Sequence, residues 1–244
     1  MSLESEIANL VTKATDLIAY FTGKKAAIDQ AVSAAIAAVP ALDRTWFVNQ
    51  LTGDDSGPGT AAAPLKSIDK AISNTPAGGY CNVRLMSDYV HATNPVATRV
   101  LNISSDVSGT KRKLNLAYQL SAEGAYSLSG FGMTSGGGLG FLDITLVLPT
   151  PVGLNPAPVG TANVLIKTYS SSIVSAYALK LVACDVQAPA EFSGALVTAN
   201  NNAVSLEVMT TTFPSSFGGR YVQGVASGTA SNTLSNVLTN LASL

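Results

Sequence analysis

Residues 45–73 constrain the fold of this chain more than any other stretch, because a strand, a loop and a helix are predicted there in direct succession. Residues 46–48 are aromatic or β-branched and suit a half-buried strand. The glycine, aspartate, serine and proline residues of 53–59 predict a turn-rich loop. Pro64 suits the first turn of a helix. Apolar residues then recur on one helical face, at Leu65, Ile68 and Ile72. This face must pack on the residues that follow.

Short β-prone runs, separated by glycine, proline, asparagine and serine, fill most of the remaining chain. They lie at 80–86, 99–103, 113–118, 127–130, 141–148, 163–168, 177–184, 195–199 and 204–209. No exact repeat is visible, but loops of different length hide the period of a solenoid, in which each coil must only present apolar residues to the next. Residues 200–202 are three asparagines and predict a corner or an asparagine ladder. The proline-containing residues 149–160 predict a protruding loop.

The C-terminal residues carry apolar side chains at helical spacing, at Leu234, Val237, Leu238, Leu241 and Leu244. Either a terminal helix or a last coil that covers the end of the body explains them, because an uncovered end would expose unpaired strand edges.

Residues 45–73 resemble the segment that opens the right-handed parallel β-helix of bacteriophage tail spikes and tail fibres. The likeness consists of an aromatic strand that ends in Asn49, a Gly-Asp-Asp turn at 53–55, a loop of small residues at 57–60, and the run Pro-Leu-Lys-Ser-Ile at 64–68. Similar openings also occur in secreted polysaccharide lyases and other β-helix proteins.

The resemblance implies a mainly β fold, a right-handed parallel β-helix of the pectate-lyase-like solenoid type, whose first coil is capped by the short helix. It also implies a homotrimer that belongs to a virion and recognises a bacterial surface. We therefore expect three parts: a helical trimeric stalk or attachment segment at 1–40, a capping strand, loop and helix at 41–76, and a β-helical body at 77–244.

The N-terminal part carries a heptad seam, with apolar residues spaced alternately four and three positions apart. The candidate oligomerisation residues are Leu3, Ile7, Leu10, Leu17 and Phe21. Thr22 and Gly23 interrupt the seam, and an alanine-rich helical run follows until Pro40. We expect two helical pieces of a coiled-coil-like stalk; the alternative is an amphipathic helix packed on the body.

Charged residues make up 12% of the chain, about half of their usual share, and the mean hydropathy is +0.30. Such a surface favours an oligomer in which neighbouring chains shield apolar area. The net charge of −1 supplies no electrostatic footprint for nucleic acid. Residues 111–113 form one tight basic run, which we interpret as a solvated turn.

The first ten residues lack the features of a signal peptide, and no apolar run approaches the roughly 18 residues of a membrane span. We expect no membrane insertion, synthesis in the host cytoplasm, and a final location in the phage tail of a virion.

Metal and cofactor motifs are missing from the sequence, and we expect neither. Cys81 and Cys184 predict two buried free thiols. Asp54 and Asp55 fit a turn better than a calcium loop. The glycines at 136–140 miss both nucleotide-binding patterns and predict a flexible crossing between coils. His91, the single histidine, lacks a triad motif and predicts a turn residue.

A glycan depolymerase, either hydrolase or lyase, is the enzymatic alternative. Hydrolysis needs two carboxylates about 5 to 9.5 Å apart. Asp185 and Glu207 form the candidate pair if their strands stack, but isolated acids on exposed loops are the commoner explanation. We therefore favour a protein that is not an enzyme.

The first hypothesis is a structural and receptor-binding protein of a phage tail, which attaches to other tail or baseplate proteins and to a bacterial surface glycan or protein. Aromatic side chains stack on sugar rings at little entropic cost. The binding candidates are Tyr169, Tyr177, Phe213, Phe217 and Tyr221. A purely structural tail connector is the third alternative.

Overall fold

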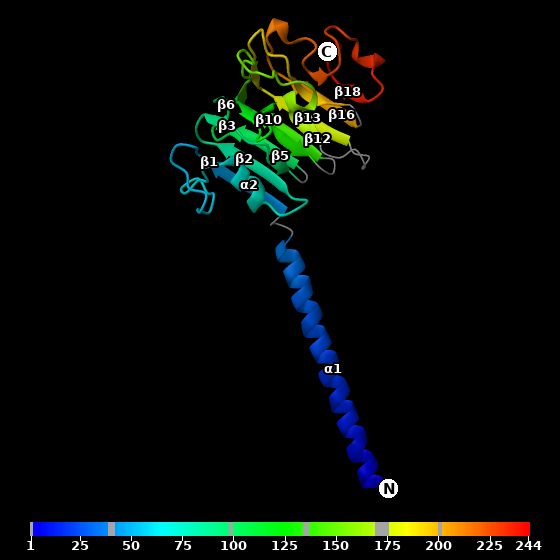
Figure 1. The fold of residues 1–244 in the computed structure, drawn as a ribbon. Coiled ribbons are helices and arrows are strands. Elements are labelled where there is room, and N and C mark those ends of the chain that lie inside the picture. The colour runs from blue at the N-terminus through cyan, green and yellow to red at the C-terminus, as the bar shows by residue number, and fades with distance from the viewer. Residues whose placement is uncertain (1, 39–41, 98–99, 134–136, 169–175, 200–201) are drawn as a thin grey trace. The chain divides into compact units, whose positions relative to one another are not determined.

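The computed structural model describes residues 2–38, 42–97, 100–133, 137–168, 176–199 and 202–244. The chain divides into two compact units, residues 1–41 and residues 42–244, and each is described by itself. The first is a helix, and the second is mainly β with parallel sheets (Figure 1).

The helix α1 (Leu3–Ala38) runs for 36 residues without interruption, so the predicted break at Thr22 and Gly23 is wrong. A Cβ added to Gly23 would have no neighbour within 4 Å, and glycine in an exposed helix costs only about 1 kcal/mol relative to alanine. The lysines and alanines that follow are good helix formers and carry the helix through this position. Pro40 lies outside the described residues.

The described residues of the body form three sheets in which every neighbouring pair of strands is parallel. Sheet A has the order β1-β2-β5-β10-β13-β16-β18, sheet B the order β14-β11-β6-β3, and sheet C the order β17-β15-β12-β9-β4. Sheet A contains β1 (Asp43–Val48), β2 (Tyr80–Leu85), β5 (Val100–Ser105), β10 (Gly137–Leu142), β13 (Ala176–Val182), β16 (Ala203–Met209) and β18 (Val237–Thr239). Sheet B contains β3 (Tyr89–His91), β6 (Arg112–Leu116), β11 (Ile144–Val147) and β14 (Asp185–Gln187). Sheet C contains β4 (Val96–Ala97), β9 (Phe131–Met133), β12 (Val164–Thr168), β15 (Ala195–Thr198) and β17 (Val222–Gln223).

The chain visits these sheets in a fixed order. It passes from β2 to β3 and β4, then from β5 to β6 and β9, from β10 to β11 and β12, and from β13 to β14 and β15. Each return to sheet A adds a strand beside the previous one, as the sequence of colours in Figure 1 shows. The antiparallel hairpin of β7 (Tyr118–Leu120) and β8 (Tyr126–Leu128) is inserted between β6 and β9.

The core lies between the sheets, where in-register positions of neighbouring strands carry apolar side chains. One buried column of sheet A contains Cys81, Leu101, Leu139, Leu179 and Leu206, and another contains Val83, Ile103, Phe141 and Leu181. Because side chains alternate between the two faces of a strand, the residues between these columns point outward. Parallel pairing in register therefore aligns the outward-facing residues of neighbouring strands in rows, as it aligns the buried ones.

The corner between sheets A and B uses left-handed backbone at equivalent positions. Asp143, Ala183 and Thr210, which follow β10, β13 and β16, have φ values of 54°, 53° and 47°. This conformation re-aims the chain within one or two residues, and it costs a residue with a Cβ about 1–2 kcal/mol. Packing between neighbouring strands stabilises these corners.

The segment from 45 to 73 confirms its predicted order of strand, loop and helix, with β1 followed by α2 (Ile68–Asn74). The helix begins at Ile68, four residues after Pro64, because Leu65 forms a parallel bridge with Val48 at the edge of sheet A. Asp55 accepts hydrogen bonds from the Lys66 and Ser67 amides, at 2.9 Å each, and so orders the loop before the helix.

The structure decides two further predictions. Residues 137–140 belong to strand β10 and not to a flexible crossing, while 136 lies outside the described residues. The C-terminal apolar residues surround strand β18 and a short 3-10 turn, η4 (Ser231–Thr233), so the terminal helix is excluded there. Asn200 and Asn201 lie outside the described residues. None of the described helices is long and apolar enough to cross a membrane.

Candidate functional site

A groove of about 590 Å³ crosses the outward face of sheet A. It spans five neighbouring strands, β1, β2, β5, β10 and β13. Its lining residues are Asp43, Thr45, Asn82, Arg84, Asn102, Ile103, Ser104, Gly140, Phe141, Leu142, Lys180 and Val182. We call this feature the sheet A groove. A volume of this size lies within the range of small-ligand sites, roughly 300–1,000 Å³.

A ladder of side-chain amides runs along one part of the groove. Asn82 Nδ2 donates to Asp43 Oδ1 at 2.7 Å, and Asn102 Nδ2 donates to Asn82 Oδ1 at 2.9 Å. The ladder exists because Asn82 and Asn102 are paired in register on β2 and β5. An asparagine ladder was predicted at 200–202, and the structure has one at Asn82 and Asn102. The sequence did not indicate this ladder, because each of the two asparagines is isolated in its own strand.

The groove has a floor without side chains at Gly140, the next position in register after Asn102. A Cβ at Gly140 would lie 2.5 Å from Asn102 Oδ1. The hollow therefore depends on glycine at this position, because any larger residue would displace the ladder amide.

Two cations lie along the groove. Lys180 Nζ lies 3.0 Å from Glu207 Oε1, but both side chains are almost half exposed, so the ion pair is weak. Arg84 is exposed, and its Nη1 donates to the carbonyl of Ser105 at 3.4 Å. Within the described part of the chain, no carboxylate forms an ion pair with Arg84. Its guanidinium is thus available to a ligand.

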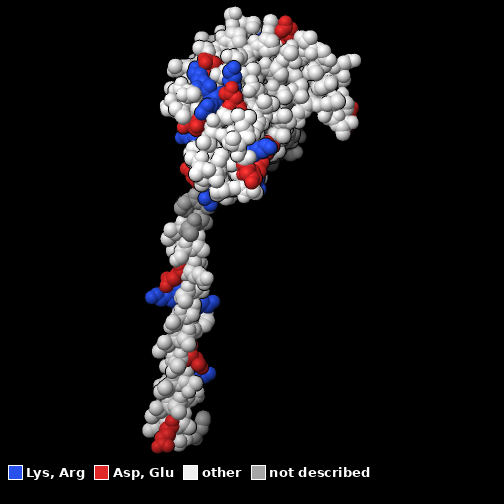
Figure 2. Space-filling view, turned by 90° about the vertical axis from the view of Figure 1, so that its left-hand side faces the viewer, with Lys and Arg blue, Asp and Glu red and all other residues white. Residues whose placement is uncertain are grey.

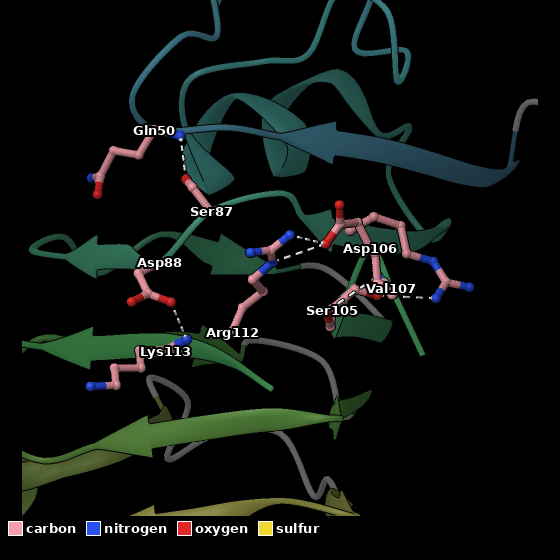
Figure 3. Close-up of polar contacts among 9 residues, drawn as sticks. Gln50, Ser87, Asp88, Ser105, Asp106, Val107, Arg112 and Lys113 are labelled. Atoms are coloured by element: carbon pink, nitrogen blue, oxygen red, sulfur yellow. Dashed lines mark hydrogen bonds and ion pairs between the residues drawn. The ribbon is translucent and has the colours of Figure 1, made fainter. Parts of the chain in front are cut away.

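Several separate polar contacts lie at the corner beside the groove, drawn in Figure 3. Asp106 Oδ1 accepts from Arg112 Nε at 3.0 Å and lies 3.0 Å from Arg112 Nη2. Asp88 Oδ1 accepts from the Lys113 amide at 2.9 Å. The predicted solvated turn at 111–113 is wrong in this respect, because Arg112 and Lys113 belong to strand β6. Lys111 forms an ion pair with an acid too, and Figure 2 shows positive and negative side chains side by side on this face.

The two candidate catalytic acids are not brought together. Asp185 lies in β14 of sheet B, 2.8 Å from Lys111 Nζ, and accepts from Thr212 Oγ1 at 2.7 Å. Glu207 lies in β16 of sheet A and pairs with Lys180. The hydrogen bond from Lys111 is the main cause that lowers the pKa of Asp185, which favours a carboxylate over a proton donor.

The five aromatic candidates have different positions. Tyr169 lies outside the described residues. Tyr177 is 1% exposed and donates to the Met133 carbonyl at 3.3 Å. Phe213, Phe217 and Tyr221 form one cluster with ring centroids 5.0, 5.0 and 5.1 Å apart.

This aromatic cluster belongs mainly to the core. Phe217 is fully buried, and burial raises the pKa of Tyr221. Phe213 also lines a second groove of about 490 Å³, together with Val147, Leu148, Val186, Gln187, Ala188, Pro189, Thr212 and Pro214. Among the described residues, Phe213 is therefore a predicted binding aromatic that borders a groove.

His91 is a buried strand residue and not a turn residue. It lies in β3 and stacks on Phe131 with ring centroids 4.4 Å apart. Its Nε2 lies 2.9 Å from the Gly130 carbonyl, which makes Nε2 the protonated nitrogen, and Nδ1 is buried without a partner. Burial lowers the pKa of His91 and keeps the ring neutral.

Lys167 is a second buried basic group. Its Nζ donates to the carbonyls of Val164 at 3.1 Å and Ala162 at 3.3 Å, at the end of the 3-10 turn η2 (Gly160–Asn163). Burial lowers the pKa of Lys167 to about 8. These contacts describe a structural cap of η2.

The prediction for the cysteines is confirmed, because Cys81 and Cys184 are both buried and free. Burial raises the pKa of Cys81 to about 11, so this thiol is unreactive. Asp54 and Asp55 bind loop amides, as their turn prediction requires. The described residues contain no group of three or more histidines, cysteines and acids that could hold a metal ion.

No family model matches this chain, and no curated protein or solved structure matches it significantly. The geometry of the body is therefore the basis for a functional assignment. The sheet A groove was missed in the sequence. Its signal is the alternation of polar and apolar residues in 82–85 and 101–104, which marks outward positions but does not reveal which strands become neighbours.

Proposed function

We propose that this protein is a receptor-binding component of a phage tail spike or tail fibre that binds a bacterial surface glycan through the sheet A groove. The observation that carries the proposal is this groove, which lies across five strands of a rigid parallel sheet. Sites on such sheets are held in a fixed geometry, and amides with an available guanidinium suit a hydroxyl-rich ligand.

The proposed fold is a right-handed parallel β-helix that begins with the strand, loop and helix of residues 45–73. The regular passage through sheets A, B and C supports it, as do the buried in-register columns of the core. The resemblance of 45–73 to the opening of tail-spike solenoids supplies the handedness and the biological context.

The proposed oligomer is a homotrimer assembled through α1. The helix is about 54 Å long at 1.5 Å per residue, yet its seam residues have exposed fractions between 53% for Ile7 and 74% for Leu3. Val11 and Ile18 are also exposed and widen the seam beyond the narrow stripe of a two-stranded coil. A lone helix with this surface needs partner helices, and attachment to another tail protein would use the same segment.

Binding is favoured over cleavage by the position of the acids. Asp185 and Glu207 belong to different sheets, and each forms an ion pair with its own lysine. A hydrolase needs two carboxylates that face one scissile bond. The body therefore offers a better case for recognition than for depolymerisation.

The test is binding of the fluorescently labelled full-length protein to a panel of encapsulated and unencapsulated bacterial strains. We expect binding that is restricted to some strains and lost after periodate oxidation of the cell-surface glycans. Binding to no strain by a correctly assembled protein would contradict the proposal and favour a structural connector. Loss of capsule during incubation would instead favour the depolymerase.

A further inference from the structure

We infer that the sheet A groove selects a glycan that carries carboxylate groups, with Arg84 as the anchor of the carboxylate. This inference rests on the proposed function and names its class of ligand. It can fail while glycan binding by another surface of the protein remains true.

The span of the groove across the strands can accommodate a segment of an extended chain. Neighbouring strands lie about 4.8 Å apart, so five strands span roughly 19 Å across the sheet. Gly140 opens this span at β10, since it contributes no side chain between Asn102 and Lys180. A ligand that follows the groove crosses the strands and meets the outward residue of each in turn.

The polar groups of the groove match hydroxyl groups. A side-chain amide offers two N–H donors and a carbonyl acceptor. The ladder uses one N–H of Asn82 and one N–H of Asn102, which leaves one donor on each amide. Thr45 adds an exposed hydroxyl group to the lining, whereas the Ser104 hydroxyl is buried and donates to the Val83 carbonyl at 3.2 Å. Polysaccharides are rich in hydroxyl groups, which both donate and accept hydrogen bonds, and they therefore match such a mixed set of donors and acceptors.

The charge of the groove selects an acidic sugar over a neutral one. Arg84 has a carbonyl and no carboxylate as its hydrogen-bonding partner among the described residues, and a guanidinium binds carboxylates in a bidentate manner. Lys180 provides a second cation farther along the groove, held by an exposed ion pair that a ligand can exchange. Asp43, the acid in the lining, accepts a hydrogen bond from Asn82 and keeps its charge. It is, however, paired in register with Tyr80, four residues before Arg84 on β2.

Stacking does not supply an alternative mode of recognition here. Phe141 is the aromatic residue among the described lining residues, and it is only 2% exposed because its ring faces the core. Neutral sugars are commonly held by an exposed aromatic ring. The groove offers charge and hydrogen bonds in place of such a platform.

The test uses the full-length protein and two variants, each with a matched control. Arg84→Gln removes the anchor, and Lys113→Gln removes an exposed cation on strand β6 of sheet B as its control. Gly140→Ala fills the floor. Gly138→Ala adds the same methyl group to the same face of the same strand, where its nearest neighbour would be 3.6 Å away.

The probes are immobilised polygalacturonate, alginate, hyaluronate and polysialic acid, the same polymers after carboxyl reduction, and neutral dextran. We expect at least one carboxylated polymer to bind at least tenfold more tightly than its reduced form. Arg84→Gln and Gly140→Ala should each lose at least tenfold in affinity. Lys113→Gln and Gly138→Ala should bind as the unaltered protein does, with all five proteins sharing the same native mass and thermal midpoint within a few degrees.

Equal binding of carboxylated and reduced polymers, or binding that Arg84→Gln leaves unchanged, would overturn the inference while receptor binding by another surface would stand. Binding to none of these polymers would overturn it as well, and if the labelled protein also bound no bacterial strain, the proposed function would fall with it. A change in native mass caused by Gly140→Ala, with no effect on binding, would assign the groove to a contact between copies and refute the glycan site.

Discussion

The side chain of Gln50 pairs with the backbone of Val90 as a neighbouring strand would. The Val90 amide donates to Gln50 Oε1 at 2.7 Å, and Gln50 Nε2 donates to the Val90 carbonyl at 2.9 Å. Val90 lies in β3, the edge strand of sheet B. Unpaired edges are sites of aggregation, so the amide satisfies backbone groups that another chain could otherwise take. Asn240 forms the same pair of bonds with Val208 of sheet A. The Val208 amide donates to Asn240 Oδ1 at 2.9 Å, and Asn240 Nδ2 donates to the Val208 carbonyl at 2.7 Å.

Gln50→Ala should lower the free energy of unfolding by about 1–2 kcal/mol, because two hydrogen bonds to an exposed edge are lost. Near neutral pH, the stability of Gln50→Glu should lie between that of Gln50→Ala and that of the unaltered protein. A carboxylate accepts from the Val90 amide but cannot donate to the Val90 carbonyl. Urea unfolding of the full-length protein measures both effects. Gln187→Ala, an exposed residue of β14, is the control and should change stability by less than about 0.5 kcal/mol. An equal loss in the control would remove the edge-pairing explanation.

Acid should destabilise the body through His91. Burial lowers the pKa of His91 in the folded protein, so the unfolded chain binds the additional proton, and folded-state stability falls as pH drops below the unfolded value near 6.5. The slope of this loss should not exceed about 1.4 kcal/mol per pH unit, which is the limit for one proton. His91→Gln keeps a donor for the Gly130 carbonyl and should flatten this part of the profile. A variant profile parallel to that of the unaltered protein would show that another group titrates.

Ala183→Gly should stabilise the body by about 0.5–1 kcal/mol. The left-handed backbone at Ala183 costs a residue with a Cβ about 1–2 kcal/mol, while glycine adds roughly 0.5–1 kcal/mol of chain entropy in the unfolded state. Ala203→Gly is the control, since Ala203 lies in extended strand β16, and it should destabilise the body. Thermal unfolding separates the two. Destabilisation of similar size at both positions would mean that the corner is not strained.

Leu10→Lys combined with Leu17→Lys should convert the proposed trimer to a monomer, because each lysine would place charge in the apolar seam of α1. Thr12→Lys combined with Thr15→Lys adds the same charge outside the seam and should leave the trimer intact. Native mass by light scattering at several concentrations is the measurement. A trimer in both variants would place assembly in the body, and a monomer of the unaltered protein would reject a trimer altogether.

The sequence predicted local structure best where side chains influence the conformation of their own backbone. The aromatic strand, the glycine and aspartate turn and the helix α2 follow one another in the predicted order, and only the start of the helix differs. Most strands of sheet A were also predicted, because they are long enough to show alternation. The strands β4 and β17 have two residues each and show no period at all.

The amino-acid sequence by itself determined which segments extend, which turn and which residues seek the core. Only the tertiary structure decided that Asn82, Asn102, Gly140 and Lys180 stand in one row, because parallel pairing joins positions separated by loops of unequal length. Stacking also placed His91 against Phe131 and drew the glycines of β10 into a strand. Local propensity acts over a few residues, whereas the groove is a product of register between neighbouring strands. That register is set by how buried side chains of successive strands pack together.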